Sequence, residues 1–229
     1  MPADVDGLVL KVCGLTRVAD LRCAEAAGAH YCGCIVEIER SPRSLARDEA
    51  VLLARACRVQ PVLVVEHMPL DDLLGLAEAA HPAAVQLHGD AGAEYMLALV
   101  DALRGRAGVW RSLGLPAQAE NRDTAVAEAL AQIAACREAD VSAIVLDTHT
   151  ERGTGGTGQT CDWEAAAAII TDSPLPVLLA GGLSPENLRE AIEATSPAGV
   201  DLSSSLESSP GRKDPARLRQ LAASWRAVE

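Results

Sequence analysis

The chain has 229 residues, of which 49% are hydrophobic, so it is long enough to bury a substantial core. Acidic residues outnumber basic ones 32 to 20, for a net charge of -12, which argues against a general binder of nucleic acid or of anionic membranes. No apolar stretch approaches the ~20 residues of a membrane span, and Met1 to Asp6 lack the features of a secretory signal, so we expect a soluble, cytoplasmic protein.

Short apolar runs alternate with segments of helical spacing along the chain. The runs are continuous rather than alternating, which is typical of strands buried on both faces of a parallel sheet. We expect strands at residues 8–12, 29–36, 61–65, 83–87, 109–113, 143–146, 176–180 and 199–202. The spacing predicts helices at residues 18–27, 47–57, 70–80, 93–103, 121–137, 163–170, 185–194 and 215–227. Two of these helices have a cap residue before proline at their expected starts, at Ser184-Pro185 and Asp214-Pro215.

Eight strand–helix pairs in a chain of this length predict a compact (β/α)8 barrel, a TIM barrel, with residues 1–229 as one domain. A doubly wound sheet is the alternative, and it would place a phosphate loop after the first strand. That strand is followed by Cys13-Gly14-Leu15-Thr16, which is not a GxGxxG motif. The glycine- and serine-rich loops follow the sixth, seventh and eighth strands instead, which favours the barrel.

Polar side chains follow most of the expected strands, and in a barrel these strand ends form the active site. Candidates from the early and middle strands are Cys13, Arg43, Glu66, His67, Gln86, His88 and Asp147. Some of them could merely cap loops.

The late loops contain Gly155 and Gly156, Gly181 and Gly182, and the run Ser203, Ser204 and Ser205. Barrel enzymes commonly bind phosphate after the seventh and eighth strands, where backbone N–H groups point at the anion. Taken singly, Gly-Gly is a turn signal and a serine run is a flexible loop. At adjacent strand ends, together, they predict a phosphate site.

Cys13 is the candidate base and Asp147 is the candidate acid. A thiol acts as a base only where a cation or helix dipole favours the thiolate, and Lys11 shares the face of Cys13 on the same strand. A carboxylic acid opposite it could donate a proton if it is partly desolvated. From spacing alone, a lone cysteine after a strand is more often structural.

Several motifs occur in one order along the chain. They are KVCGLT at 11–16, SPR at 41–43, VQLHG at 85–89, LDT at 146–148, GGTG at 155–158, AGGLSPEN at 180–187 and VDLSS at 200–204. Each motif is weak alone, but the ordered set resembles the phosphoribosylanthranilate isomerase family of tryptophan biosynthesis.

The resemblance implies a (β/α)8 barrel that catalyses an Amadori rearrangement of a phosphosugar amine without a cofactor or a metal. It implies that Cys13 is the general base that removes the C2′ proton and that Asp147 is the general acid at the furanose ring oxygen. It further implies that Arg43 meets the anthranilate carboxylate and that the late loops hold the phosphate, with Lys11, Gln86 and His88 as further substrate-binding residues. The expected partner is a small phosphosugar amine, and the expected state is a monomer or a homodimer.

The chain departs from the family pattern at the expected aryl end of the site. Glu37, Glu66 and His67 lie where they would oppose a carboxylate or favour an amine or hydroxyl. Ser205 replaces a usual glycine, and it would be strained by ~1 kcal/mol or more if its φ had to be positive. These departures keep two alternatives open, namely a paralogue acting on another phosphosugar amine and a barrel that binds a phosphorylated ligand without turnover.

Overall fold

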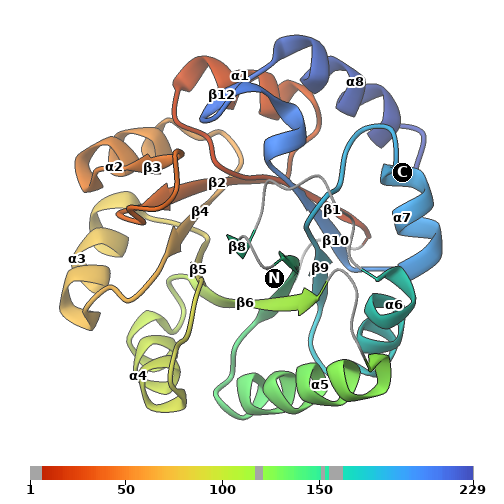
Figure 1. Ribbon diagram of the computed structural model, residues 1–229. Helices are drawn as coiled ribbons and strands as arrows, with labels where there is room; N and C mark the ends of the chain where they lie inside the picture. The colour runs from red at the N-terminus through yellow and green to blue at the C-terminus, as the bar shows by residue number, and fades with distance from the viewer. Residues whose placement is uncertain (1–6, 117–120, 151–152, 155–161, 229) are drawn as a thin grey trace.

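Eight parallel strands close into a barrel in the computed structural model, which describes residues 7–116, 121–150, 153–154 and 162–228 (Figure 1). Around the barrel they lie in the order β1, β2, β4, β5, β6, β7, β9 and β10, and β10 pairs with β1 to close the ring. Their bounds are β1 Val9–Val12, β2 Tyr31–Val36, β4 Gln60–Val65, β5 Ala84–Leu87, β6 Gly108–Pro116, β7 Ala143–Thr150, β9 Val177–Leu179 and β10 Gly199–Leu202. The predicted barrel is confirmed.

The strands are apolar on both faces because each face packs against a different layer. Leu10 and Val12 belong to the large core between the strands and the surrounding helices. Val9 points the other way, into a cluster inside the barrel that includes Tyr31 and Trp110. The rings of Tyr31 and Trp110 meet edge to face with centroids 4.9 Å apart. In a chain without phenylalanine, these two rings are the largest side chains of the cluster inside the barrel.

Eight α-helices surround the strands in the described residues (Figure 1). Their bounds are α1 Val18–Ala26, α2 Arg47–Ala56, α3 Leu70–Ala80, α4 Ala93–Leu103, α5 Arg122–Glu138, α6 Trp163–Asp172, α7 Leu188–Thr195 and α8 Pro215–Trp225. None of the helices in these ranges is long and apolar enough to cross a bilayer. Short elements that the sequence did not predict are β3 Ser44–Leu45, β8 Gly153–Thr154, the 3-10 helix η1 Ser204–Leu206, β11 Glu207–Ser209 and β12 Arg212–Lys213.

The expected start of the seventh helix at residue 185 is wrong, because residues 184–187 form a turn. The side-chain oxygen of Asn187 accepts a hydrogen bond from the Ser184 backbone N–H at 2.8 Å. Its amide nitrogen donates to the Gly182 carbonyl at 3.0 Å. Asn187 therefore holds the loop that follows β9, and regular helix begins only at Leu188.

We expect Gly199→Ala to lower the melting temperature, because Gly199 lies at the seam where the barrel closes. It pairs with Val9, and an added Cβ would lie 2.7 Å from the Val9 carbonyl oxygen. Overpacking of this kind costs about 1–3 kcal/mol. Gly75→Ala is the matched control, since the exposed helical Gly75 has no neighbouring atom within 4 Å and alanine there should stabilise by about 0.5–1 kcal/mol. Thermal denaturation checks both, and equal shifts in the two variants would contradict the close packing at the seam.

Candidate active site

A cavity of about 350 Å³ lies at the C-terminal ends of the strands. Nine residues that the sequence singled out line it, namely Cys13, Arg43, Gln86, His88, Asp147, Gly181, Gly182, Ser203 and Ser204. Lys11 and Ser205 are not among the lining residues. Gly155 and Gly156, also singled out, lie outside the described residues. The barrel thus brings groups that are far apart in the sequence to one opening.

Cys13 follows β1 and is 7% exposed, on the face that carries Val9 and Lys11 below it. Lys11 is fully buried and donates to Asp201 Oδ2 at 2.5 Å. Gly33 on β2 leaves the space for both side chains, since a Cβ there would lie 2.7 Å from Cys13 Sγ and 3.2 Å from Lys11 Nζ. Lys11 therefore supports the thiol from beneath rather than lining the cavity.

Burial and the neighbouring charge of Lys11 shift the pKa of Cys13 in opposite directions. Burial raises the pKa of the Cys13 thiol, while the Lys11 ammonium works to lower it. Burial opposes the charge on Lys11, but Asp201 and Cys13 outweigh it and raise the pKa of Lys11. Burial also raises the pKa of Asp201, yet the 2.5 Å contact with Lys11 stabilises the ionised pair. A permanent cation under the thiol is the arrangement that favours a thiolate when the proton leaves.

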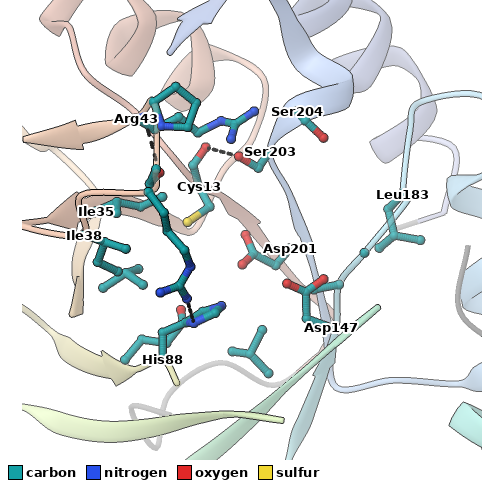
Figure 2. A pocket seen from close by; sticks show the side chains of 18 of the residues that line it. Cys13, Ile35, Ile38, Arg43, His88, Asp147, Leu183, Asp201, Ser203 and Ser204 are labelled. Carbon is teal, nitrogen blue, oxygen red and sulfur yellow. Dashed lines mark hydrogen bonds between the residues drawn. The ribbon is translucent and has the colours of Figure 1, made fainter. Parts of the chain in front are cut away.

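Asp147 reaches the cavity from β7, on the other side of the opening from Cys13 (Figure 2). It is half-buried. Asp201 lies between the two, and its Oδ1 is buried without a hydrogen-bond partner among the described residues. The sequence reasoning did not single out Asp201 as a site residue. In the sequence Asp201 is a charged residue within an apolar strand and part of the VDLSS motif, but its pairing with Lys11 depends on the register of β1 and β10.

The loops after β9 and β10 form one wall of the cavity. Gly181 and Gly182 have φ values of 80° and 65°, a left-handed conformation that glycine adopts without strain. The Ser203 hydroxyl donates to the Cys13 carbonyl at 3.1 Å, which ties this wall to the end of β1 (Figure 2). Ser205 lies within η1 and is not among the described non-glycine residues with positive φ, so the strain considered for it does not arise.

Arg43 is held in a buried ionic cluster. Its Nε and Nη2 donate to the two carboxylate oxygens of Glu207, each at 2.8 Å. Lys213 donates to the same carboxylate at 3.0 Å and to the Ser203 carbonyl at 3.0 Å. Burial alone would raise the pKa of Glu207, but Arg43 and Lys213 hold it below its usual value. One edge of the Arg43 guanidinium is therefore already bound by a carboxylate.

The wall opposite the serine loop is apolar. Ile35, Ile38 and Val64 line it and cluster with Cys13. Figure 2 shows Ile35 and Ile38 on the side of the cavity away from Ser204 and Leu183. The cavity therefore has a polar loop wall and an apolar wall, with Cys13 and Asp147 facing the space between them.

Arg40 and His88 border the apolar wall, and the sequence reasoning did not single out Arg40. Glu37 and His67, which were expected near it, do not line the cavity. Glu37 directly follows β2 and His67 lies two residues after β4, and both have a left-handed conformation with φ of 51°. Glu37 forms an ion pair with Arg47 at 3.0 Å, and His67 is exposed. These two residues therefore do not oppose a ligand carboxylate in the cavity.

Comparison with known proteins identifies a family for most of the chain. Residues 10–223 match the family model described as N-(5'phosphoribosyl)anthranilate (PRA) isomerase. The N-(5'-phosphoribosyl)anthranilate isomerase of Haloferax volcanii is 36% identical over 217 residues, which cover 93% of this chain and 91% of that protein. The enzyme of the same name from Methanothrix thermoacetophila is 34% identical over 224 residues, covering 96% and 99%. The crystal structure of phosphoribosyl anthranilate isomerase from Thermotoga maritima superposes with a TM-score of 0.81 at 27% identity, covering 96% of this chain and 99% of that one.

Proposed function

Because this chain belongs to the N-(5'-phosphoribosyl)anthranilate isomerase family, we propose that Cys13 and Asp147 carry out its isomerisation from opposite sides of the cavity. The reaction is an Amadori rearrangement of N-(5-phosphoribosyl)anthranilate to 1-(2-carboxyphenylamino)-1-deoxyribulose 5-phosphate. The observation that supports this proposal most strongly is the placement of a buried thiol over a lysine, facing a half-buried carboxyl group across the cavity.

In the first step Asp147, in its protonated form, donates a proton to the furanose ring oxygen. The bond from C1′ to this oxygen breaks, and the aryl nitrogen lone pair forms a carbon–nitrogen double bond. A general acid is needed here because the leaving alkoxide would otherwise develop a full negative charge. Asp147 is half-buried and lines the cavity, so its carboxyl group can reach a bound substrate.

In the second step the Cys13 thiolate removes the proton from C2′. The electrons of that bond form a C1′–C2′ double bond and neutralise the iminium nitrogen. The resulting enol loses its hydroxyl proton and gains one at C1′ to become the ketone. The atoms balance by proton transfers alone, so the proposal needs no cofactor. Lys11 supports the step by its charge beneath the thiol.

The walls of the cavity position the substrate for these steps. We assign the phosphate to Gly181, Gly182, Ser203 and Ser204, which lie on adjacent loops at the strand ends. The apolar wall suits the aryl ring, and Arg43 contributes positive charge toward its carboxylate. Gln86 and His88 also line the cavity, while roles for Gly155, Gly156 and Ser205 remain predictions. Fixing the substrate at both ends is itself a large contribution to rate.

Turnover of N-(5-phosphoribosyl)anthranilate by the purified protein tests the function directly. We expect the deoxyribulose product to form, as detected by chromatography, and we expect the gene to restore growth of a tryptophan auxotroph lacking this isomerase. Turnover only of a different phosphosugar amine would indicate the paralogue, and tight binding without any turnover would indicate the non-catalytic barrel.

The phosphate assignment predicts that Gly182→Val weakens inhibition by inorganic phosphate by about tenfold or more, through the loss of charge-assisted backbone hydrogen bonds. A β-branched residue cannot adopt the left-handed conformation of Gly182 without strain. Gly105→Val is the control, because Gly105 also has positive φ, at 73°, with no atom within 4 Å of an added Cβ. Inhibition constants are measured for both variants, and unchanged phosphate inhibition in Gly182→Val would contradict the assignment.

We propose that residues 1–229 act as one barrel domain in the cytoplasm, as a monomer or a homodimer. Support for a single domain comes from the barrel, whose first and last strands pair with each other. Light scattering on the purified chain measures the oligomeric state.

A further inference from the structure

Two cysteines that do not line the cavity meet where β2 packs against α2. Cys32 on β2 is fully buried and points into the core between the strands and the helices, whereas its neighbour Tyr31 points into the barrel. Cys57 directly follows α2, is half-buried and packs against the same core. The Cys32 thiol donates a hydrogen bond to the Cys57 sulfur. A buried thiol and a partly accessible one are therefore in direct contact.

The backbone on both sides of Cys57 is bound by one ion pair of α1. Arg22 donates to the carbonyl of the preceding residue, Ala56, at 2.9 Å. Glu25 accepts a hydrogen bond from the backbone N–H of the following residue, Arg58, at 2.7 Å. Arg22 and Glu25 pair with each other at 2.7 Å. These bonds hold the Cys57 thiol against the strand, in a short link between α2 and β4.

The contact makes the two thiols chemically unequal. The hydrogen bond from Cys32 lowers the pKa of Cys57, and Arg22 acts in the same direction, while burial and the charge of Glu25 oppose them. The same hydrogen bond, together with burial, raises the pKa of Cys32. The thiolate is the nucleophilic form of cysteine. Cys57 is therefore the thiol suited to attack an oxidant, and Cys32 stays protonated beside it.

The other cysteines that the structure describes lack this combination of access and a neighbouring thiol. Cys13, Cys34 and Cys136 are buried, and burial raises the pKa of each thiol. Cys23 on α1 is half-buried like Cys57, so it matches Cys57 in access. Among these residues, Cys57 alone is both half-buried and hydrogen-bonded to a second thiol.

We propose that Cys57 is a site of reversible oxidation by hydroperoxides and that Cys32 closes the oxidised site as an intramolecular disulfide. The site lies outside the cavity, and the inference does not depend on the proposed isomerisation. Its effect is to hold the oxidised sulfur in a form that thiols can reduce, because a sulfenic acid without a partner thiol proceeds to the irreversible sulfinic acid.

The chemistry takes two steps. The Cys57 thiolate attacks the peroxide, so that a sulfur–oxygen bond forms and the oxygen–oxygen bond breaks, and the leaving oxygen takes up a proton as an alcohol or water. The Cys32 sulfur then attacks the Cys57 sulfur, and a disulfide bond forms as the sulfur–oxygen bond breaks. The departing hydroxide leaves as water with the proton of Cys32. Two thiols thus lose two electrons, and one peroxide is reduced by two.

Peptide mapping by mass spectrometry tests the proposal on the full chain. The reduced protein is treated with hydrogen peroxide in the folded state, and the remaining thiols are alkylated in denaturant. We expect a cross-linked pair of peptides that contain Cys32 and Cys57, lighter by two hydrogens than the separate peptides and separated again by dithiothreitol. Cys23→Ser is the matched control, because it removes the other half-buried described cysteine, and it should form the cross-link as the wild type does.

Two variants separate the roles of the pair. Cys57→Ser should lose the cross-link and leave Cys32 reduced. Cys32→Ala should also lose the cross-link, but Cys57 should accumulate as a sulfenic acid that dimedone traps and that further peroxide converts to the sulfinic acid. Oxidation of Cys13 or Cys23 before Cys57 in the wild-type protein would overturn the proposal, as would a wild-type Cys57 sulfenic acid that never forms a disulfide with Cys32. Both of these outcomes are measured without a variant, so they do not depend on how a substituted chain folds.

Discussion

Cys13→Ser lowers kcat by at least about two orders of magnitude and leaves the melting temperature nearly unchanged, because it removes a general base but preserves side-chain shape. A serine hydroxyl is far less acidic than a thiol and cannot cycle as a base near neutral pH without a base of its own. Steady-state kinetics and thermal denaturation measure the two effects. Cys23→Ser, the same change at a half-buried residue of α1, is the control and should leave kcat unaltered.

The pH dependence of kcat/KM also tests whether Cys13 is the base. Burial raises the pKa of Cys13, so the thiol is protonated at neutral pH and the thiolate fraction increases as the pH rises. We expect kcat/KM of the wild-type protein to rise with pH on the acidic side of that pKa and this rise to be absent in Cys13→Ser. Full activity in Cys13→Ser would show that another group is the base.

Asp147→Asn removes the general acid and should lower kcat by about 10²- to 10⁴-fold. The amide keeps the shape of the carboxyl group but cannot transfer a proton to the ring oxygen. Asp123→Asn is the control, since Asp123 is exposed in the first turn of α5, and it should behave as wild type. Kinetics with the same substrate measure both. If Asp147→Asn retained its rate, the acid would have to be another cavity carboxyl, and Asp201 would be the group to change next.

The barrel could be predicted from sequence because its signal is local. Each strand is a short apolar run buried on both faces, and most runs are followed by a polar or glycine-rich strand end. That rule placed Cys13 and Asp147 among several strand-end candidates, and the family resemblance then assigned their roles. The start of α7 was misjudged because proline after serine is typical of a helix start, whereas here Asn187 uses the Ser184 backbone to close a turn.

The contacts that were missed join residues far apart in the chain. Lys11 and Asp201 are 190 positions apart and meet only when the barrel closes. Arg40 and Glu66 are 26 positions apart, so the sequence showed a carboxylate near the aryl end without the arginine that neutralises it. Glu37 and His67 were expected in the site because they follow strands, but their left-handed backbone turns the chain there. Local patterns thus locate the strand ends, while the pairing of charges depends on register.

The bond between Lys11 and Asp201 also bears on how the chain matures during synthesis. Lys11 is made with the first barrel strand, 190 positions before its carboxylate partner, which emerges only with the last barrel strand. Until then Cys13 lacks both β10 and the serine loop that lie beside it in the finished protein. A nascent or C-terminally truncated chain would therefore present this thiol to oxidants and alkylating reagents. The rate of Cys13 modification in shortened chains, relative to the full chain, would therefore report how far the barrel has closed.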